Sequence, residues 1–393
     1  MKRQLLGVAA ILLSISTYAQ DNPLWMRYCA ISPDGTTIAF TYKGDIYTVP
    51  STGGRASQIT TNPAHDTKPI WSPDGKKIAF ASDRMGSMDI FEVNKEGGIP
   101  KRLTTHSGNE TPVAYKDAGH ILFLANIMPT VEDAQFPSGQ FQQVYEVNTE
   151  GGRPALFSSM PMEDISINHT GNTLLYHDKK GYEDPWRKHH TSSITRDIWL
   201  CSLNGNRTFR KQTTFNGEDR TPVWTSDDKS FYYLSEEKGS FNIFKRDIDG
   251  NTSKQITNHT KHPVRFLSAA SNGTLCYGYD GEIYTVKEGA IPQKVQISIV
   301  TDKNDKDLIR QIKRSGATEI SLSPDAKEIA FVLRGDVYVT STEYSTTKQI
   351  TNTPQQERDI HFSPDGRSIV YASERNGLWQ IYQTSLAKKE EKQ

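Results

Sequence analysis

An all-β fold built from repeated four-stranded units is predicted by three recurring patterns in the 393-residue sequence. The first is the turn phrase SPDG, which occurs between apolar segments at 32–35, 72–75 and 363–366. The second is a strand-like hexamer of the type GDIYTV, first seen at 44–49. The third is a short segment ending in threonine, such as SQIT at 57–60. Their fixed order over a period of about 40 residues is typical of β-propeller blades, each a four-stranded antiparallel sheet.

The turn phrase predicts a β-hairpin at Ser72–Gly75. Proline presets φ for the second position of a type I turn, aspartate suits the third, and glycine accepts the left-handed φ that follows. In the next strand, Ile78 and Phe80 lie on one face and alanines lie on the other. A strand that is apolar on both faces is expected to be buried between stacked sheets.

The hexamers and the threonine segments predict the third and fourth strands of each unit. The hexamers lie at 44–49, 88–93, 142–147, 196–201, 241–246, 281–286, 335–340 and 379–384. The threonine segments lie at 57–60, 101–104, 211–214, 254–257 and 348–351. Four units keep the turn slot without its proline, at 115–120, 168–172, 226–229 and 268–273. An array of β-sandwiches would not require this internal order.

The units are expected to form two groups. Six units occupy residues 24–302 and two more occupy residues 318–386. The charged segment 303–317 lacks strand alternation and predicts a linker or short helix, and 387–393 reads as a charged tail. The last unit lacks a fourth strand.

Two arrangements of these units remain open. In the first, a six-bladed ring is followed by the first two blades of a second, truncated propeller. In the second, all eight units form a single eight-bladed ring, and the segment around Leu24–Met26 supplies the missing strand. The linker falls where a six-bladed ring would close, which favours the first arrangement and a longer parent chain. Two blades alone would leave an apolar face and open edges exposed.

The first twenty residues predict a cleavable signal peptide. Lys2 and Arg3 precede the apolar stretch Leu5–Ile15, which is too short to span a bilayer, and a cleavage site is expected near Ala19 or Gln20. We therefore expect a periplasmic or secreted protein with no membrane insertion.

Composition excludes several classes of partner. Lysine plus arginine equals aspartate plus glutamate at 46 each, so the chain has no electrostatic footprint for nucleic acid. Cys29, Cys201 and Cys276 lie in strand-like segments, and their spacing matches no metal site. We interpret them as buried small apolar side chains. No cofactor and no metal are expected.

No catalytic residue is predicted in this chain. The sequence contains no G-x-S-x-G nucleophile elbow, no phosphate-binding P-loop and no H-E-x-x-H zinc motif. Binding is the function that remains, and a propeller binds through the loops between its strands. Two such loops are long, at 126–141 and 178–197.

The second long loop contains candidate peptide-binding residues: Trp186, Arg187, Lys188, His189 and His190. A cationic cluster beside an aromatic ring is suited to hold the C-terminal carboxylate of a peptide. The alternative is a solvated loop or one that docks another domain. We do not expect His189 and His190 to bind a metal, because adjacent side chains on an extended loop diverge.

The repeats resemble the TolB-like, WD-type propeller repeats of exported bacterial proteins. Six units, a charged joint and the segments SLSPDAKEIAFVLRGDVYV (321–339) and FSPDGRSIVYASERNGLWQIY (362–382) are similar to the N-terminal part of tricorn-type serine peptidases. The insert at 182–199 shares this similarity. The resemblance implies a six-bladed propeller, a seven-bladed propeller, and then PDZ and protease domains that carry the catalytic serine downstream of this chain.

The favoured hypothesis is therefore the non-catalytic front part of an exported tricorn-like serine peptidase that guides or filters peptides. The steric reason is that a narrow channel admits an extended chain but not a folded domain. One alternative is a stand-alone TolB-like propeller that binds protein partners, although TolB-type proteins carry an α/β domain before their blades. Another is the propeller of a dipeptidyl-peptidase-like hydrolase, which would require an α/β-hydrolase domain after the blades.

Overall fold

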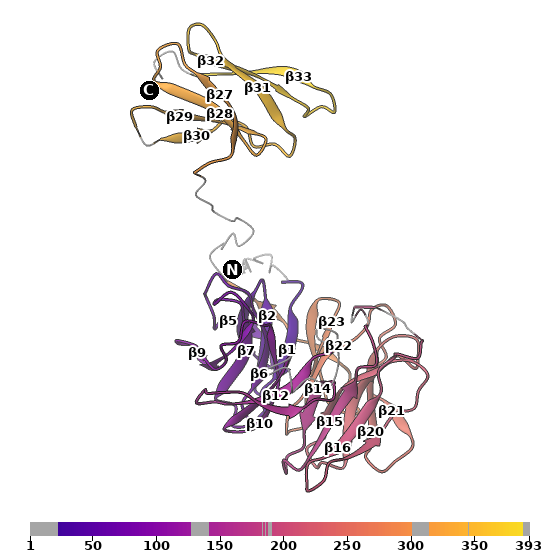
Figure 1. Ribbon diagram of the computed structural model, residues 1–393. Helices are drawn as coiled ribbons and strands as arrows, with labels where there is room; N and C mark the ends of the chain where they lie inside the picture. The colour runs from indigo at the N-terminus through magenta and orange to yellow at the C-terminus, as the bar shows by residue number, and fades with distance from the viewer. Residues whose placement is uncertain are drawn as a thin grey trace, which may run out of the picture. The chain divides into compact units, whose positions relative to one another are not determined.

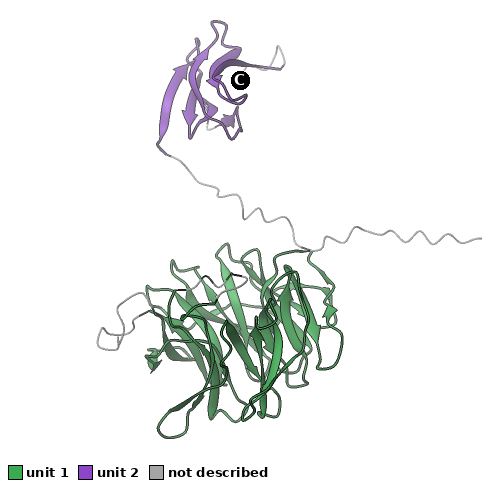
Figure 2. Cartoon of the chain, turned by 90° about the vertical axis from the view of Figure 1, so that its right-hand side faces the viewer, with its two compact units in different colours: residues 1–306 green, residues 307–393 purple. Residues whose placement is uncertain are grey.

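The computed structural model describes residues 23–126, 141–182, 184, 186–187, 191–300, 314–344 and 346–387. Every regular element in these ranges is a β-strand, which confirms the predicted all-β fold of antiparallel sheets. In the described part of the chain, no helix is long and apolar enough to cross a membrane. The chain divides into two compact units, residues 1–306 and 307–393 (Figure 2).

The first unit contains six four-stranded sheets, each made from one stretch of chain, with β4 left out of the first sheet (Figure 1). The first sheet contains β1 (Arg27–Ile31), β2 (Thr37–Tyr42), β3 (Asp45–Pro50) and β5 (Ser57–Gln58). The second contains β6 (Asp66–Trp71), β7 (Lys77–Ser82), β8 (Asp89–Asn94) and β9 (Lys101–Arg102). The third contains β10 (Glu110–Asp117), β11 (His120–Ala125), β12 (Gln143–Asn148) and β13 (Ala155–Ser158).

The next three sheets repeat this order. The fourth contains β14 (Met162–Ile167), β15 (Thr173–Asp178), β16 (Ile198–Ser202) and β17 (Thr208–Lys211). The fifth contains β18 (Asp219–Trp224), β19 (Ser230–Ser235), β20 (Asn242–Asp247) and β21 (Ser253–Gln255). The sixth contains β22 (Arg265–Ala269), β23 (Leu275–Tyr279), β24 (Glu282–Val286) and β25 (Gln293–Lys294). Each hexamer of the sequence forms the third strand of its sheet, as predicted.

The turn phrase closes a hairpin through its own side chains. Ser72 Oγ donates a hydrogen bond to Asp74 Oδ1 at 2.7 Å and accepts one from Lys77 N at 2.9 Å. Gly75 has a φ of 68°, the left-handed conformation that glycine adopts without strain. The phrase therefore fixes the length and register of the first two strands.

The second strands are buried on both faces, as predicted. In β7, Ile78 and Phe80 pack with residues of the first sheet, including Ala39 and Ile46. Ala79, on the opposite face, packs with residues of the third sheet. Each sheet thus shares one core with the sheet before it and another with the sheet after it.

The six first strands form a closed series. Each of β1, β6, β10, β14 and β18 contacts the first strand of the next sheet, and β22 of the sixth sheet contacts β1 of the first. One apolar cluster joins the two end sheets, with Cys29 and Phe40 from the first and Cys276 and Ile283 from the sixth. These contacts favour a six-bladed ring over a ring of eight.

Backbone hydrogen bonds also cross the seam between the first and sixth sheets. Met26 N donates to Gly281 O of the sixth sheet at 3.1 Å, so the segment around Leu24–Met26 pairs there. After the sixth sheet, β26 (Ile297–Ser298) pairs in parallel with β4 (Gly54–Arg55).

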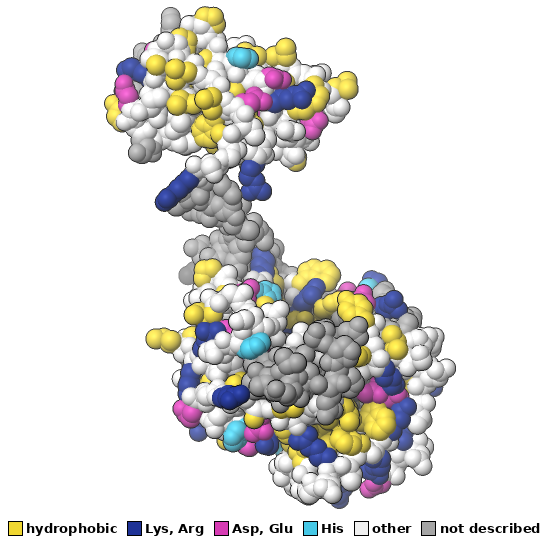
Figure 3. Space-filling view, in the orientation of Figure 1, with side chains coloured by type: hydrophobic (Ala, Val, Ile, Leu, Met, Phe, Trp, Pro, Cys, Tyr) yellow, Lys and Arg dark blue, Asp and Glu magenta, His cyan; other side chains and the backbone are white. Residues whose placement is uncertain are grey.

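The second unit contains two sheets. One has four strands, β27 (Ala317–Leu322), β28 (Glu328–Leu333), β29 (Asp336–Ser341) and β30 (Thr347–Gln349). The other has three within the described residues, β31 (Glu357–Phe362), β32 (Ser368–Ser373) and β33 (Gln380–Ser385). Ile320 on β27 and Ile381 on β33 are exposed, and Figure 3 shows apolar side chains among charged ones on this unit.

Some predicted segments lie wholly or mostly outside the described residues. They are the signal peptide at 1–20, most of the loop at 126–141, most of the linker at 303–317 and most of the tail at 387–393. Ala317, placed in the linker by the sequence, already begins β27.

The threonine segments have a specific structural role. In five sheets the threonine hydroxyl accepts a hydrogen bond from the backbone N–H near the start of the third strand, at 2.8–3.0 Å. These threonine caps are Thr60, Thr104, Thr213, Thr257 and Thr351. All five are buried, so the N–H has no access to water as an alternative partner.

Replacing a threonine cap by valine should destabilise the ring. Thr257→Val removes the acceptor for Ile243 N and the donor to Asn242 Oδ1 while keeping the side-chain shape. We expect the free energy of unfolding to fall by about 1–3 kcal/mol, the usual cost of an unsatisfied buried polar group. Urea unfolding followed by fluorescence measures the change. Thr260→Val, at an exposed position of the same loop, is the control and should change little; equal effects of the two substitutions would contradict the role of the cap.

Acidic side chains at the start of the first strands are buried at the boundary between sheets. Arg84 Nη2 donates to both carboxylate oxygens of Asp66 at 2.9 Å. In the fifth sheet the acid is Asp219, but Glu237 occupies the position that matches Arg84. Asp219 is 1% exposed, and burial raises its pKa to about 7, although Ser235 and Thr213 donate hydrogen bonds to it.

Asp219 should therefore make the stability of the ring fall as pH rises. In the unfolded chain this carboxyl ionises near its usual pKa of about 4, whereas in the folded chain it stays protonated until about pH 7. Its contribution is present below pH ~4 and is lost as pH rises towards 7. Asp219→Asn mimics the protonated form, so its free energy of unfolding relative to the wild type should increase between pH 5 and pH 8.

The matched control for this measurement is Asp66→Asn. It breaks a buried ion pair and should lower the free energy of unfolding at both pH values. Urea titrations at the two pH values measure both variants, and a pH-independent effect of Asp219→Asn would contradict the assignment.

Candidate binding site on the innermost strands

The candidate site begins with a backbone irregularity that recurs in the first strands. Their pairing with the second strand contains a register shift in every sheet of the first unit. In five of these sheets a non-glycine residue at the shift has a φ between 48° and 57°. These bulge residues are Tyr28, Lys68, Asp164, Thr221 and Phe266. Because a bulge redirects a side chain, and left-handed φ is unfavourable for such residues, the surrounding sheets must hold them in place.

The bulge residues of neighbouring first strands meet one another. The rings of Tyr28 and Phe266, from the first and sixth sheets, have centroids 4.8 Å apart. Lys68 Nζ, from the second sheet, lies 5.7 Å from the centroid of Tyr28. The first strands of the first, second and sixth sheets thus bring an aromatic pair and a cation close together.

Trp186 reaches these side chains from the fourth sheet. Its ring centroid lies 4.8 Å from Arg27 Cζ of the first sheet and 4.9 Å from Arg265 Cζ of the sixth. Arg265 Nη2 also donates to Trp186 O at 2.9 Å, and the ring is 6.2 Å from that of Phe266. Burial and the nearby Arg220 lower the pKa of Arg265 to about 10. The loop after β15 therefore connects three sheets through one indole.

The outcome for the other predicted loop residues is mixed. Arg187 is exposed, and its backbone N–H donates to Asp184 O at 3.2 Å. Lys188, His189 and His190 lie outside the described residues. Of the predicted cluster, the structure therefore brings Trp186 into the candidate site, together with Arg27 and Arg265, which the sequence did not single out.

A sequence signal for the bulge residues does exist. Lys68 and Thr221 each lie two residues after the acid that begins the first strand, Asp66 and Asp219. Aligning the units on this position would have placed the bulge residues in one register. Arg27 and Arg265 each precede a bulge residue by one position, so the same alignment would have grouped them.

A polar network lies on the side formed by the fourth and fifth sheets. His177 is buried, and its Nδ1 accepts a hydrogen bond from Thr221 N at 3.3 Å. This bond places the ring proton on Nε2, which lies 3.2 Å from Glu163 Oε2. Thr221 Oγ1 donates to Asp164 Oδ2 at 2.6 Å. The Thr221 hydroxyl therefore faces a carboxylate and not a histidine base.

Glu163 is the electrostatic centre of this network. Burial alone would raise its pKa, but His177 and Lys179 hold the pKa well below its usual range. Lys179 Nζ donates to Glu163 Oε1 at 2.7 Å. Arg196, which is buried, lies 3.5 Å from Glu163 and 2.6 Å from Glu218. Glu163 and Glu218 are thus largely compensated by cations of the fourth sheet.

Lys68 lies near Tyr28 on the aromatic side of the candidate site and is also influenced by the carboxylates of the fourth sheet. Burial lowers the pKa of its amine, and Asp164 and Glu163 of the fourth sheet act in the opposite direction. Burial likewise raises the pKa of Tyr28. The site therefore offers aromatic surfaces and guanidinium groups on one side and a carboxylate, Asp164, on the other, which suits binding of a polar extended ligand. In the described ranges, no group of three or more His, Cys, Asp or Glu residues could hold a metal ion.

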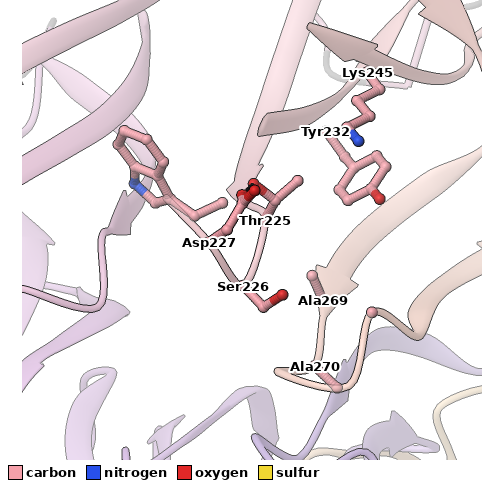
Figure 4. Close-up of a pocket in the computed structure, with 9 residues that line it drawn as sticks. Thr225, Ser226, Asp227, Tyr232, Lys245, Ala269 and Ala270 are labelled. Carbon is pink, nitrogen blue, oxygen red and sulfur yellow. Dashed lines mark hydrogen bonds between the residues drawn. The ribbon is translucent and has the colours of Figure 1, made fainter. Parts of the chain in front are cut away.

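A pocket between the fifth and sixth sheets is another candidate site (Figure 4). The turn residues Thr225, Ser226 and Asp227 line it from the fifth sheet, and Ala269 and Ala270 line it from the sixth. Its charged groups already have partners: Lys245 Nζ donates to Glu288 Oε2 at 3.0 Å, and Asp227 Oδ1 accepts from Thr225 Oγ1 at 2.6 Å. It is the weaker candidate because its charged groups already have partners in the turn and in the loop after β24.

Comparison with known proteins places this fold in a family. A family model described as the tricorn protease N-terminal beta propeller domain matches residues 23–290. Tricorn protease homolog 1 of Streptomyces coelicolor is 25% identical over 365 residues, which cover 90% of this chain and 32% of that protein. The tricorn protease homolog of Saccharolobus solfataricus is 26% identical over 296 residues, which cover 72% of this chain and 26% of that protein.

A solved structure shares the fold. The crystal structure of the tricorn protease aligns with a TM-score of 0.63 at 18% identity, over 94% of this chain and 36% of that chain. This chain therefore spans about a third of the length of the relatives that it matches. The resemblance inferred from the repeats is confirmed: the chain belongs to the family of tricorn protease N-terminal β-propeller domains.

Proposed function

We propose that this chain is the non-catalytic front part of an exported tricorn-like serine peptidase, and that its ring binds extended peptides and guides them. The proposal rests on one observation. Trp186 lies between Arg27 and Arg265, which belong to the first strands of the first and sixth sheets. Export is proposed from the signal-like sequence at 1–20, and the peptidase context from the names of the longer relatives.

The chemistry of the site fits a peptide end. Two guanidinium groups beside an indole can pair with a terminal carboxylate, while the indole and the rings of Tyr28 and Phe266 offer apolar surface to a side chain. Asp164, across the ring, can accept hydrogen bonds from backbone N–H groups. A ligand held between these groups must be extended, because the side chains of the first, second and sixth sheets already contact one another in the site.

Loss of the two arginines should weaken peptide binding. We expect Arg27→Ala and Arg265→Ala each to raise the Kd of a short unstructured peptide about tenfold, because each removes one charge-assisted contact. Fluorescence anisotropy of an N-terminally labelled peptide measures this Kd. The same peptide with an amidated C-terminus should bind the wild type more weakly and respond less to either substitution.

The control for these variants is Arg210→Ala. Arg210 lies on the outermost strand of the fourth sheet, where it pairs with Asp249 at 2.9 Å, and its loss should leave the Kd unchanged. Equal weakening by all three substitutions would indicate a general charge effect and would contradict the site. The chain alone should leave the peptide uncleaved, and cleavage would contradict the non-catalytic assignment.

Trp186 should report binding directly. A carboxylate that draws Arg27 and Arg265 away from the indole changes the surroundings of Trp186, so a saturating peptide should change the tryptophan emission of the wild type. Trp186→Phe keeps an aromatic ring and should abolish most of this change while the other five tryptophans remain. An undiminished change both in Trp186→Phe and in Trp25→Phe, which removes the indole 5.5 Å from Arg27 Cζ, would place the peptide elsewhere on the ring.

A further inference from the structure

Two buried cysteines lie on the two sheets that close the ring. Cys29 is in β1 of the first sheet and Cys276 is in β23 of the sixth. They are 4% and 0% exposed, and both belong to the apolar cluster that joins these sheets. Both thiols are free in the structure. The third cysteine, Cys201, is buried in the fourth sheet and belongs to a different cluster.

The two residues face each other across the seam. Ser268 of β22 contacts both backbones, because its Oγ lies 3.5 Å from Cys29 O and 3.4 Å from Cys276 O. Both side chains enter the apolar cluster at the seam. Cys29 Sγ is also 3.5 Å from Phe266 O of the sixth sheet. Close backbones and side chains that enter the same cluster are what a disulfide between two residues requires.

The seam is the place where a covalent link would have the largest effect. In the first unit the four strands of each sheet come from one continuous stretch of chain, and neither end sheet takes a strand from the other within the described residues. Backbone bonds such as Ser271 N to Pro33 O at 2.9 Å, and Gly54 N to Gln296 O at 2.8 Å, hold the seam instead. A bond between positions 29 and 276 would enclose 248 residues, which is 276 − 29 + 1.

We propose that Cys29 and Cys276 form a disulfide that locks the ring when the chain folds in the presence of a disulfide oxidant. With oxidised glutathione, one cysteine thiolate attacks the glutathione disulfide and releases one reduced glutathione. The second cysteine then attacks the mixed disulfide, and the Cys29–Cys276 bond forms as a second reduced glutathione leaves. Two thiols are oxidised to one disulfide, one glutathione disulfide is reduced to two thiols, and no net proton is released.

The bond must form while the seam is still open. Burial raises the pKa of Cys276 well above its usual value, and the attacking species is the thiolate. In the closed ring the Cys276 thiol is therefore protonated, and burial shields both thiols from oxidant. The seam joins sheets from the two ends of the unit, so it closes the longest loop of the chain and is expected to form late in folding. Oxidant present at that stage reaches both thiols, whereas oxidant added to the folded ring reaches them slowly.

The experiment compares refolding with and without oxidant. The full chain is refolded from denaturant in a mixture of reduced and oxidised glutathione, its free thiols are alkylated under denaturing conditions, and peptides are mapped by mass spectrometry without reduction. We expect a peptide pair linked through Cys29 and Cys276, with the number of free thiols falling from three to one and Cys201 alkylated. Three free thiols after oxidative refolding, or a bond that includes Cys201, would overturn the proposal.

A second measurement tests whether the disulfide stabilises the ring. The oxidised ring should unfold at a higher urea concentration than the reduced ring, because a crosslink over a long loop restricts the unfolded chain. The difference should persist in Cys201→Ser and vanish in Cys29→Ser. If the disulfide forms but the urea midpoint does not shift, the proposal that it stabilises the closed ring is wrong. Because the test is made in vitro, its result does not depend on export or on peptide binding.

Discussion

The contact between the first and sixth sheets is the constraint on which the rest of the ring depends. The second strand of each sheet is apolar on both faces, so a sheet buries its apolar surface only when it has two neighbours. The chain supplies neighbours in order for the inner sheets, but the end sheets have only each other. Their shared cluster includes Ile38, Phe40 and Ile283, all fully buried, and each such side chain stabilises the ring by about 1.5–3 kcal/mol.

Polar groups between the sheets also fix the positions of individual strands. A threonine cap fixes the start of the third strand, and a buried acid fixes the first strand of the following sheet. This frame explains how five non-glycine residues persist in left-handed conformations on the innermost strands. Strained residues supply part of the candidate site, among them Lys68 and Asp164, and the surrounding strands hold their side chains in positions that the first strands alone would not favour.

Most of the fold could be predicted from the sequence because its determinants are local. Turn phrases and hexamers act within a few residues, and each threonine cap acts on a residue 14 or 15 positions earlier, so their order predicts the strands of every sheet. The candidate site depends on longer-range geometry. Trp186 was predicted from its loop, but Arg27 and Arg265 lie 159 and 79 positions away in the sequence, and each looks like an ordinary cation at the start of a strand. The two arginines meet at the same indole only because the ring closes. Local sequence patterns do not show which sheets meet when the ring closes.

At the proposed site, ring closure and ligand binding are expected to be coupled. Trp186 comes from the fourth sheet, Arg27 from the first and Arg265 from the sixth, so a ligand that contacts all three binds the closed ring and not an open one. By linkage, such a ligand stabilises the seam by the same free energy by which the seam strengthens binding of the ligand. Any interaction that holds the first and sixth sheets together, whether apolar packing, backbone pairing or a covalent bond, pre-organises the two guanidinium groups. The same contact that completes the core thus also assembles the candidate site.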